Sequence, residues 1–369
     1  MDEIKRLFSV IEDRRHPGYV KHNLADMLIM IMGGVICGIT ELADMMVYFE
    51  SKLPFYREYF GIEKYPSKPT LSRILSMVDG DAVGKVIAEI MRRKAGKLGD
   101  IIATDGKAIR STGQKDQAHS FLQIVTAYVT ESGVTLGQEA ISHEDKTNEI
   151  PVFQSMLGYL DVKGKTITAD ALHCQKETCR IIKAKAGNYL FGLKGNQSGL
   201  YEDIALFFSD TINDADIQTF ETIEKSGGRI ERRICRASDK IQWLADLPLW
   251  EGLQAILSIT RITTAKGKTS QETSYYISSL PCDPQNLLFV ARAHWLIESM
   301  HWSLDVIWHE DSCALLSQNG HKTLNSFRKL ALLAHKRHIS SLTKKSSVKS
   351  NVLAALLNDN LCLTVMRCL

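Results

Sequence analysis

The spacing of apolar residues changes near residue 100, and this change limits the folds open to the chain. From residue 1 to about 95, apolar residues recur every three or four positions, which predicts helices. After that come short apolar runs such as IIATDGKAI at 101–109, which are typical of strands. We therefore expect a helical N-terminal part followed by a mixed α/β part.

The α/β part has a definite order of predicted elements. Three strands come first, then helix, strand, helix and strand, at residues 101–109, 121–130, 133–141, 149–160, 165–172, 174–187 and 188–195. The second of these helices is expected to end at Gly187. This order is that of a ribonuclease-H-like fold, a mixed sheet flanked by helices in which the first and fourth strands lie side by side.

The remaining chain is expected to complete this core. Residues 201–284 contain short strand-like pieces, which we interpret as a β-rich insertion before the last core helix. The predicted organisation is an all-helical domain at 1–95, a catalytic domain at 96–340 that includes the insertion, and a basic tail or helix at 341–369.

One segment of the helical part has the features of a helix start. The run YPSKPTLSRIL places Ser67 and two prolines before an apolar helix. This helix could be the second of a helix-turn-helix that reads DNA, or it could belong to an ordinary helical hairpin.

Three acids stand in unusual surroundings. Asp105 interrupts the first strand, Asp170 ends the fourth, and Glu298 lies in the helical stretch VARAHWLIESMHWSLDV. Carboxylates brought together repel one another and are stable as anions mainly when a cation neutralises them. Mg²⁺ takes oxygen ligands and retains positions for substrate phosphates, and a pair of such ions can drive phosphoryl displacement. The three acids are therefore candidate catalytic residues and ligands of Mg²⁺, with Mn²⁺ as a possible substitute.

Each acid also has a simpler explanation. Asp105 precedes Gly106 and could cap a turn, and Asp170 could be the N-cap of the helix that follows it. Glu298 could pair with Arg292 or a nearby lysine on a solvated face. Taken with the order of the elements, however, the three acids favour a shared site.

Composition excludes several classes of protein. Hydrophobic content of 44% and charged content of 24% are those of an ordinary folded protein. The longest apolar stretch, residues 27–39, is shorter than the ~20 residues of a membrane span, so we expect a buried helix. The eight cysteines have no zinc-module or disulfide spacing, and the charged N-terminus does not resemble a signal peptide, which predicts a cytoplasmic protein.

Positive charge is concentrated at the C-terminal end. Residues 321–369 contain nine lysines and arginines against Asp359 alone, a net +8 in a chain whose total is +3. Such an end could contact a polyanion, because each phosphate that it neutralises releases counterions. It could also be a solvated basic helix.

Several longer motifs suggest a family. They are HPGYVKHNLADMLIMIMGGVICG, PSKPTLSRIL, IATDGKAIRST, DKTNEI, TADALHCQKE, YLFGLKGNQ, GRIERR, YYISSL and RAHWLIESMHWSLDVIWHED. In these stretches and their order, the chain resembles the DDE transposases of H-repeat-associated, ISAs-type insertion sequences. The resemblance implies that Asp105, Asp170 and Glu298 are the metal-binding triad of a ribonuclease-H-like core.

The resemblance also implies an activity and partners. The expected activity is Mg²⁺-dependent cleavage of DNA ends and strand transfer into target DNA, by a homo-oligomer associated with the bacterial nucleoid and not with a membrane. A stand-alone metal-dependent nuclease and a decayed, DNA-binding transposase remnant are alternatives.

Eight residues near the acids are predicted to contact DNA: Lys107, Arg110, His173, Lys194, Asn196, Gln197, His294 and His301. The segment IESMHWSLDV is one residue shorter than the usual family pattern between the glutamate and the His-Trp pair. One deletion turns the following side chains by about 100° on a helix. The predicted role of His301 therefore depends on how the helix lies. Glu310 and Asp311 are a second candidate source of the third ligand.

Overall fold

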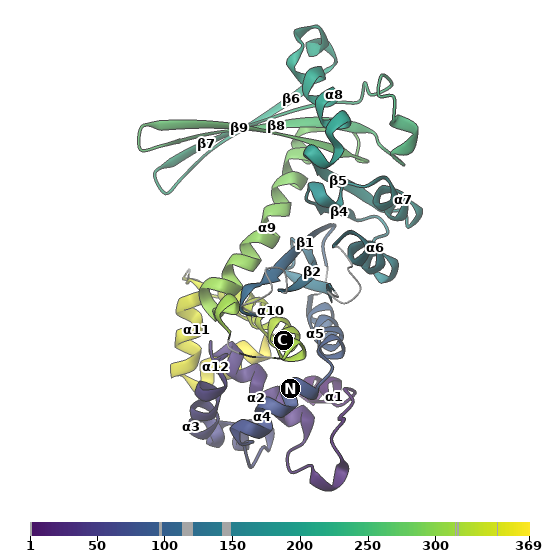
Figure 1. Ribbon diagram of the computed structural model, residues 1–369. Coiled ribbons are helices and arrows are strands. Elements are labelled where there is room, and N and C mark those ends of the chain that lie inside the picture. The colour runs from purple at the N-terminus through teal and green to yellow at the C-terminus, as the bar shows by residue number, and fades with distance from the viewer. Residues whose placement is uncertain are drawn as a thin grey trace.

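The computed structural model describes residues 2–95, 98–112, 121–141, 149–313, 315, 317–344 and 346–369. Helices form one end of the molecule, a mixed sheet lies in the middle, and long β-hairpins project at the other end (Figure 1). Both chain termini lie at the helical end (Figure 1). None of the described helices has the length and apolar character needed to span a membrane.

The N-terminal part is helical, as predicted. Its helices are α1 (Asp2–Phe8), α2 (Leu24–Ile36), α3 (Leu42–Phe60), α4 (Lys68–Met77) and α5 (Gly80–Ala95). Helix α2 holds most of the long apolar stretch and is buried along almost its whole length, which confirms a core helix. Gly33 of α2 is required there, because a Cβ would overlap the hydroxyl of Tyr56, which donates a hydrogen bond to Met30 O.

A single nine-stranded sheet forms the centre, with the order β3-β2-β1-β4-β5-β9-β8-β7-β6. Its strands are β1 (Ile101–Ile109), β2 (Leu122–Val129), β3 (Val134–Ala140), β4 (Thr166–Ala169), β5 (Asn188–Leu193), β6 (Gln218–Ser226), β7 (Arg229–Ser238), β8 (Ala255–Ala265) and β9 (Lys268–Ser278). The β1–β4 and β4–β5 pairs are parallel, and the other pairs are antiparallel. The prediction that the first and fourth strands are neighbours is confirmed.

Helices α6 (Glu149–Tyr159) and α7 (Lys176–Ala184) connect the central strands. The prediction that the second of them ends at Gly187 was wrong, because the helix ends three residues earlier. Ala186 takes the left-handed conformation (φ 56°) that usually favours glycine. Gly187 is needed instead for close packing, since a Cβ there would lie 3.0 Å from Val162 O.

The β-rich segment extends the central sheet. It begins with α8 (Ser198–Ser209), and its last strand, β9, pairs with β5. The paired strands β6–β7 and β8–β9 continue outward as the long hairpins of Figure 1. Helix α9 (Pro284–Trp308) follows and crosses the sheet, in contact with β1, β4, β5, β6 and β7.

The last three helices are α10 (Gln318–Ser340), α11 (Val348–Leu357) and α12 (Asp359–Arg367). Helix α10 packs against α2, α4, α5 and α9, so it belongs to the interior. Arg328 and Lys329 are buried, and Lys322 pairs with Asp81 at 2.8 Å. The positive charge of residues 321–369 is therefore partly internal, and the segment is not a solvated basic helix. Lys345 lies outside the described residues.

Short 3-10 helices complete the chain: η1 (Pro17–Tyr19), η2 (Arg110–Thr112), η3 (Ala171–His173), η4 (Gly195–Gln197), η5 (Thr211–Asp216), η6 (Leu247–Leu249) and η7 (Glu310–Ser312). Helices η2, η3, η4 and η7 follow β1, β4, β5 and α9 respectively, so they surround the ends of the central elements.

Candidate active site

Two of the candidate acids come together at the end of the parallel strand pair. Strand β4 pairs with β1 as far as Ala169, which lies opposite Thr104. The next residues along the two chains are Asp105 and Asp170, and they therefore stand at the same level. Asp105 is inside a strand, opposite Thr126 of β2, and so does not cap a turn.

Asp170 also caps the short helix that follows it. Its Oδ1 accepts a hydrogen bond from Leu172 N at 3.1 Å, which caps η3. The alternative of a structural N-cap is thus partly correct. A carboxylate has two oxygens, however, and capping by one leaves the other available to a cation.

Glu298 approaches both aspartates from α9. The Glu298 residue is exposed, but partial desolvation of its carboxyl raises its pKa, and Asp105 and Asp170 raise it further, while Lys194 acts in the opposite direction. Repulsion between neighbouring carboxylates explains the effect of the two aspartates. Arg292 pairs with Glu224 (2.6 Å), so Arg292 is not the partner of Glu298, whereas Lys194 does act on Glu298 as the nearby-lysine alternative expects.

A pocket with a volume of about 300 Å³ opens between the sheet and α9. Its lining includes Asp170, Lys194, His294 and Glu298. Lys194 is exposed at the end of β5, so its ammonium can meet an anion at the pocket. The pocket therefore combines two of the acids with one cation.

Two histidines of α9 lie beside the aspartates. His294 Nδ1 is 3.2 Å from Thr168 Oγ1, and His301 Nδ1 is 3.3 Å from Asp105 Oδ2. Burial lowers the pKa of His294, although Asp105 and Asp170 oppose this effect. His301 is also largely buried, and the carboxylate beside it is that of Asp105, one of the candidate acids.

The two cations that follow Asp105 differ in their surroundings. Lys107 Nζ donates to Asp305 Oδ1 at 2.6 Å and to Glu310 Oε2 at 2.8 Å, and the Lys107 side chain is 13% exposed. A phosphate contact would require Lys107 to leave both carboxylates. The Arg110 side chain is 81% exposed, 3.7 Å from Asp311, and is open to an anion.

His173 was predicted to contact DNA, but it is fully buried. Its Nε2 lies 2.8 Å from Glu149 Oε1, so the side chain is part of the interior and is closed to DNA. The Glu149 carboxylate occupies the space that a Cβ of residue 106 would need, which explains the glycine after Asp105.

Glu149 was missed as a neighbour of the site. It is the glutamate of the DKTNEI motif, and only the occurrence of that motif pointed to it. Residues 145–148 of the motif lie outside the described residues.

The amides after β5 support the backbone near Asp170. Asn196 Nδ2 donates to Ala171 O at 2.5 Å, and Gln197 Nε2 donates to Cys174 O at 3.0 Å. These bonds fix the chain that follows β4. Asn196 is exposed and Gln197 is half-buried.

The donor set of the three acids suits a hard divalent cation, because carboxylate oxygens are the ligands that Mg²⁺ prefers. A cation would also relieve the repulsion that raises the pKa of Glu298. In the described part of the chain, no three His, Cys, Asp or Glu side chains are already grouped as a metal site. The carboxylates of the three acids lie in one region and repel one another. A bound cation would have to draw them closer.

Glu310, which with Asp311 is the second candidate source of the third ligand, has another role in the structure. Glu310 is fully buried and accepts bonds from Lys107 and from Asn325 Nδ2, the latter at 2.7 Å. Burial acts to raise the pKa of Glu310, but the charges of Arg328 and Lys107 outweigh it and lower that pKa to about 2. Glu310 is therefore a charged partner of internal cations and does not replace Glu298.

Two transposase family models and several curated relatives match this chain. The family described as Transposase DDE domain matches residues 96–334, and the family described as DDE_Tnp_1-associated matches residues 5–91. "Putative transposase YncI" of Escherichia coli O157:H7 is 34% identical over 332 residues, which cover 88% of this chain and 85% of YncI. "H repeat-associated putative transposase YhhI" of Escherichia coli K12 is 30% identical over 373 residues, 96% of this chain and 98% of YhhI.

A solved structure of a piggyBac transposase synaptic complex with hairpin DNA is also similar. It matches with a TM-score of 0.46 and 12% identity, over 100% of this chain and 79% of that protein.

Proposed function

Since the chain belongs to the Transposase DDE domain family and resembles H repeat-associated transposases along most of its length, we propose that it is an active DNA transposase. It cleaves the ends of its insertion sequence with Mg²⁺ and transfers the freed 3′-hydroxyl to target DNA. The observation that carries the proposal is the position of Asp105 and Asp170 at one level of the paired parallel strands β1 and β4. Glu298 lies close enough for the two aspartates to affect its pKa.

The proposed metal ligands are Asp105, Asp170 and Glu298. Bound Mg²⁺ would activate the attacking oxygen and stabilise the leaving oxygen of an in-line phosphoryl displacement. Lys194, which acts on Glu298 and is exposed, would neutralise a phosphate beside the acids. Arg110 is the second open cation near the end of β1.

The remaining predicted DNA contacts divide by exposure. We infer that Asn196 and Gln197 act first by holding the backbone after Asp170, and that the exposed Asn196 can also meet DNA. His294 lines the pocket and is a candidate contact to the strand held there. His301 and Lys107 bind acids of the protein in this structure and support the site from within.

The proposal extends to fold and organisation. We infer a ribonuclease-H-like catalytic core, supported by the strand order β3-β2-β1-β4-β5 and the parallel β1–β4 pair. Residues 1–95 are proposed as the DNA-binding domain, residues 96–340 as the catalytic domain, and residues 341–369 as a C-terminal helical extension. The working form on DNA is proposed to be a homo-oligomer.

The test uses full-length protein and duplexes with the sequences that flank its gene. Asp105→Asn and Glu298→Gln should abolish Mg²⁺-dependent end cleavage, while Asp203→Asn and Glu202→Gln, which change exposed acids of α8, should keep it. Cleavage that persists in Asp105→Asn would overturn the assignment of that acid.

Product analysis separates the alternatives. Joined products with a target plasmid support strand transfer, whereas cleavage without joining indicates a stand-alone nuclease. DNA binding without metal-dependent cleavage by the wild type would indicate a decayed transposase.

A further inference from the structure

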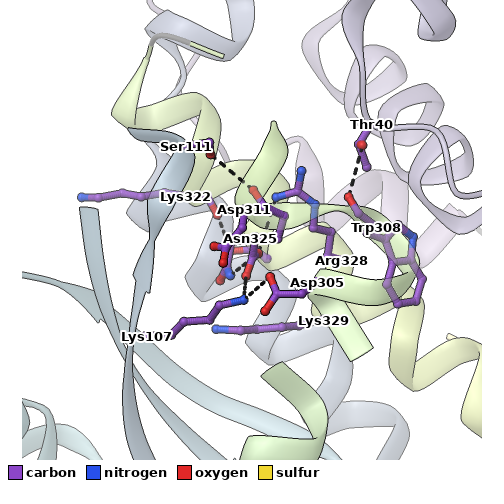
Figure 2. A network of polar contacts seen from close by, with 12 residues as sticks. Thr40, Lys107, Ser111, Asp305, Trp308, Asp311, Lys322, Asn325, Arg328 and Lys329 are labelled. Carbon is purple, nitrogen blue, oxygen red and sulfur yellow. Dashed lines mark hydrogen bonds and ion pairs between the residues drawn. The ribbon is translucent and has the colours of Figure 1, made fainter. Parts of the chain in front are cut away.

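We propose that Lys107 and Asp305 are positioning residues: their ion pair fixes α9 along β1 and thereby sets where Glu298 meets Asp105. The inference rests on the proposed function, because it concerns the same metal site. It assigns a role to the polar network that surrounds Lys107 (Figure 2).

The first argument is the spacing of residues on the two elements. Asp105 and Lys107 are two residues apart in β1, so they face the same side of the sheet. Glu298, His301 and Asp305 are spaced three and four residues apart on α9, so they form one stripe. Helix α9 and strand β1 are in contact, so the two rows can pair.

Two polar contacts connect the two rows. His301 Nδ1 lies 3.3 Å from Asp105 Oδ2, and one step further along, Asp305 Oδ1 lies 2.6 Å from Lys107 Nζ. A slip of one residue would move α9 by about 1.5 Å and turn it by about 100°, which would break both contacts. Glu298 precedes both contacts on the stripe, so its place depends on them.

Lys107 is itself held from behind. Its ammonium also binds Glu310 of η7 at 2.8 Å, and that fully buried carboxylate accepts from Asn325 Nδ2 (2.7 Å) and lies 3.5 Å from Arg328 Nη1. Figure 2 shows Lys107 among Asp305, Asn325 and Arg328. Residues of η7 and α10 therefore hold the Lys107 ammonium in place. The ion pair with Asp305 links that ammonium to α9.

Apolar packing alone would not specify this register. The buried side of α9 includes Ile297, Met300, Leu304 and Trp308, and contacts between such side chains tolerate small displacements. The Lys107–Asp305 pair is partly buried, and such an ion pair adds little net stability compared with apolar replacements. It does specify one alignment, because the ammonium must reach both carboxylates at once.

Asp305→Asn tests the proposal with little disturbance of the core. Asp305 is one-third exposed, and Lys107 keeps Glu310 after the change. Three quantities are measured on full-length protein: Mn²⁺ binding without DNA, from the electron paramagnetic resonance of free Mn²⁺; the Mn²⁺ dependence of single-turnover end cleavage; and the melting temperature. Asp203→Asn on α8 is the matched control.

Asp305→Asn should weaken Mn²⁺ binding and raise the Mn²⁺ concentration needed for half-maximal cleavage by about 10-fold. This is the usual size of the effect for residues that orient metal ligands. Its melting temperature should stay within a few degrees of the wild type. Asp305→Glu, which restores the charge, should recover part of the affinity, and Lys107→Met should lose at least as much as Asp305→Asn.

A lower melting temperature with unchanged Mn²⁺ binding would show a purely structural pair and overturn the proposal. Wild-type affinity and cleavage in Asp305→Asn would overturn it as well. Wild-type protein that binds Mn²⁺ no better than Asp105→Asn would instead refute the proposed metal site, and with it this inference.

Discussion

Glu310 and Arg328 form an ion pair in which neither side chain is exposed, with Oε1 and Nη1 3.5 Å apart. Removing one partner of a buried pair costs about 3–5 kcal/mol, because the other charge is left in the interior. Glu310→Gln keeps the shape and removes the charge, so we expect the free energy of unfolding in urea to fall by about 3 kcal/mol. Glu202→Gln, on the surface of α8, is the control. A loss no larger than that of the control would contradict the expectation.

The same pair predicts a dependence on acid. Burial acts to raise the pKa of Glu310, but Arg328 and Lys107 lower it to about 2 from its ordinary value of 4.5. Because the folded-state pKa lies below the unfolded-state value, the stabilisation is complete above pH 4.5 and is lost as the pH falls toward 2. The difference in stability between the wild type and Glu310→Gln should therefore narrow between pH 5 and the lowest pH at which the protein still folds. Unfolding curves collected at several pH values measure it, and a constant difference would contradict the assignment.

Lys329 predicts a second, opposite dependence. Its ammonium is buried and donates to Thr126 Oγ1 and Gln138 Oε1, both at 2.8 Å. Burial lowers the pKa of Lys329 to about 7 from 10.5, although Glu310 partly opposes this. Between these two values the unfolded chain binds the proton more tightly than the folded chain, so stability rises with pH.

Lys329→Met removes this titration. The free energy of unfolding of the wild type relative to Lys329→Met should therefore increase from pH 7 to pH 10. The increase should be about 1.4 kcal/mol for each unit by which folding lowers the pKa of Lys329. Urea unfolding of both proteins at pH 7 and pH 9.5 gives the comparison, since other titrating groups are common to the two. A difference that does not change with pH would mean that Lys329 stays charged in the fold.

Local patterns predicted much of the core. Strand β1 has the predicted limits, Ile101–Ile109, because apolar alternation and turn residues act over a few positions. The pairing of β1 with β4 followed from the order of the elements. Glu298 could not be joined to the aspartates by any local signal, because helices α7 and α8 and five strands separate it from Asp170, and the family resemblance supplied that connection.

Burial of charge was the main thing that the sequence did not reveal. Arg328 and Lys329 were counted with a basic surface, yet α10 is central to the packing. The partners of Lys107 are Asp305 and Glu310, about 200 positions away. A count of charges along the chain contains no information on such contacts, so the internal network became visible only in three dimensions.

His301 should matter for catalysis through Asp105. Its Nδ1 lies 3.3 Å from Asp105 Oδ2, so its loss would free that carboxylate to adopt other orientations. We expect His301→Ala to slow single-turnover end cleavage by about 10- to 100-fold, the usual effect of residues that orient metal ligands. His309→Asn is a suitable control, because His309 is exposed and Asn tolerates its left-handed backbone. Cleavage by His301→Ala at the wild-type rate would show that Asp105 needs no such support.

The turn after α7 offers a pair of changes with opposite expected signs. Ala186 has φ 56°, a conformation that costs an L-residue roughly 1–2 kcal/mol, whereas glycine adopts it freely. Ala186→Gly should therefore stabilise the protein by up to about 1 kcal/mol, after the entropy of the extra glycine is subtracted. In Gly187→Ala, the new Cβ would lie 3.0 Å from both Ile182 Cγ2 and Val162 O, which should destabilise the fold by about 1–3 kcal/mol. Unfolding free energies of the two variants decide the matter, and a shift of the same sign in both would refute this account of how α7 ends.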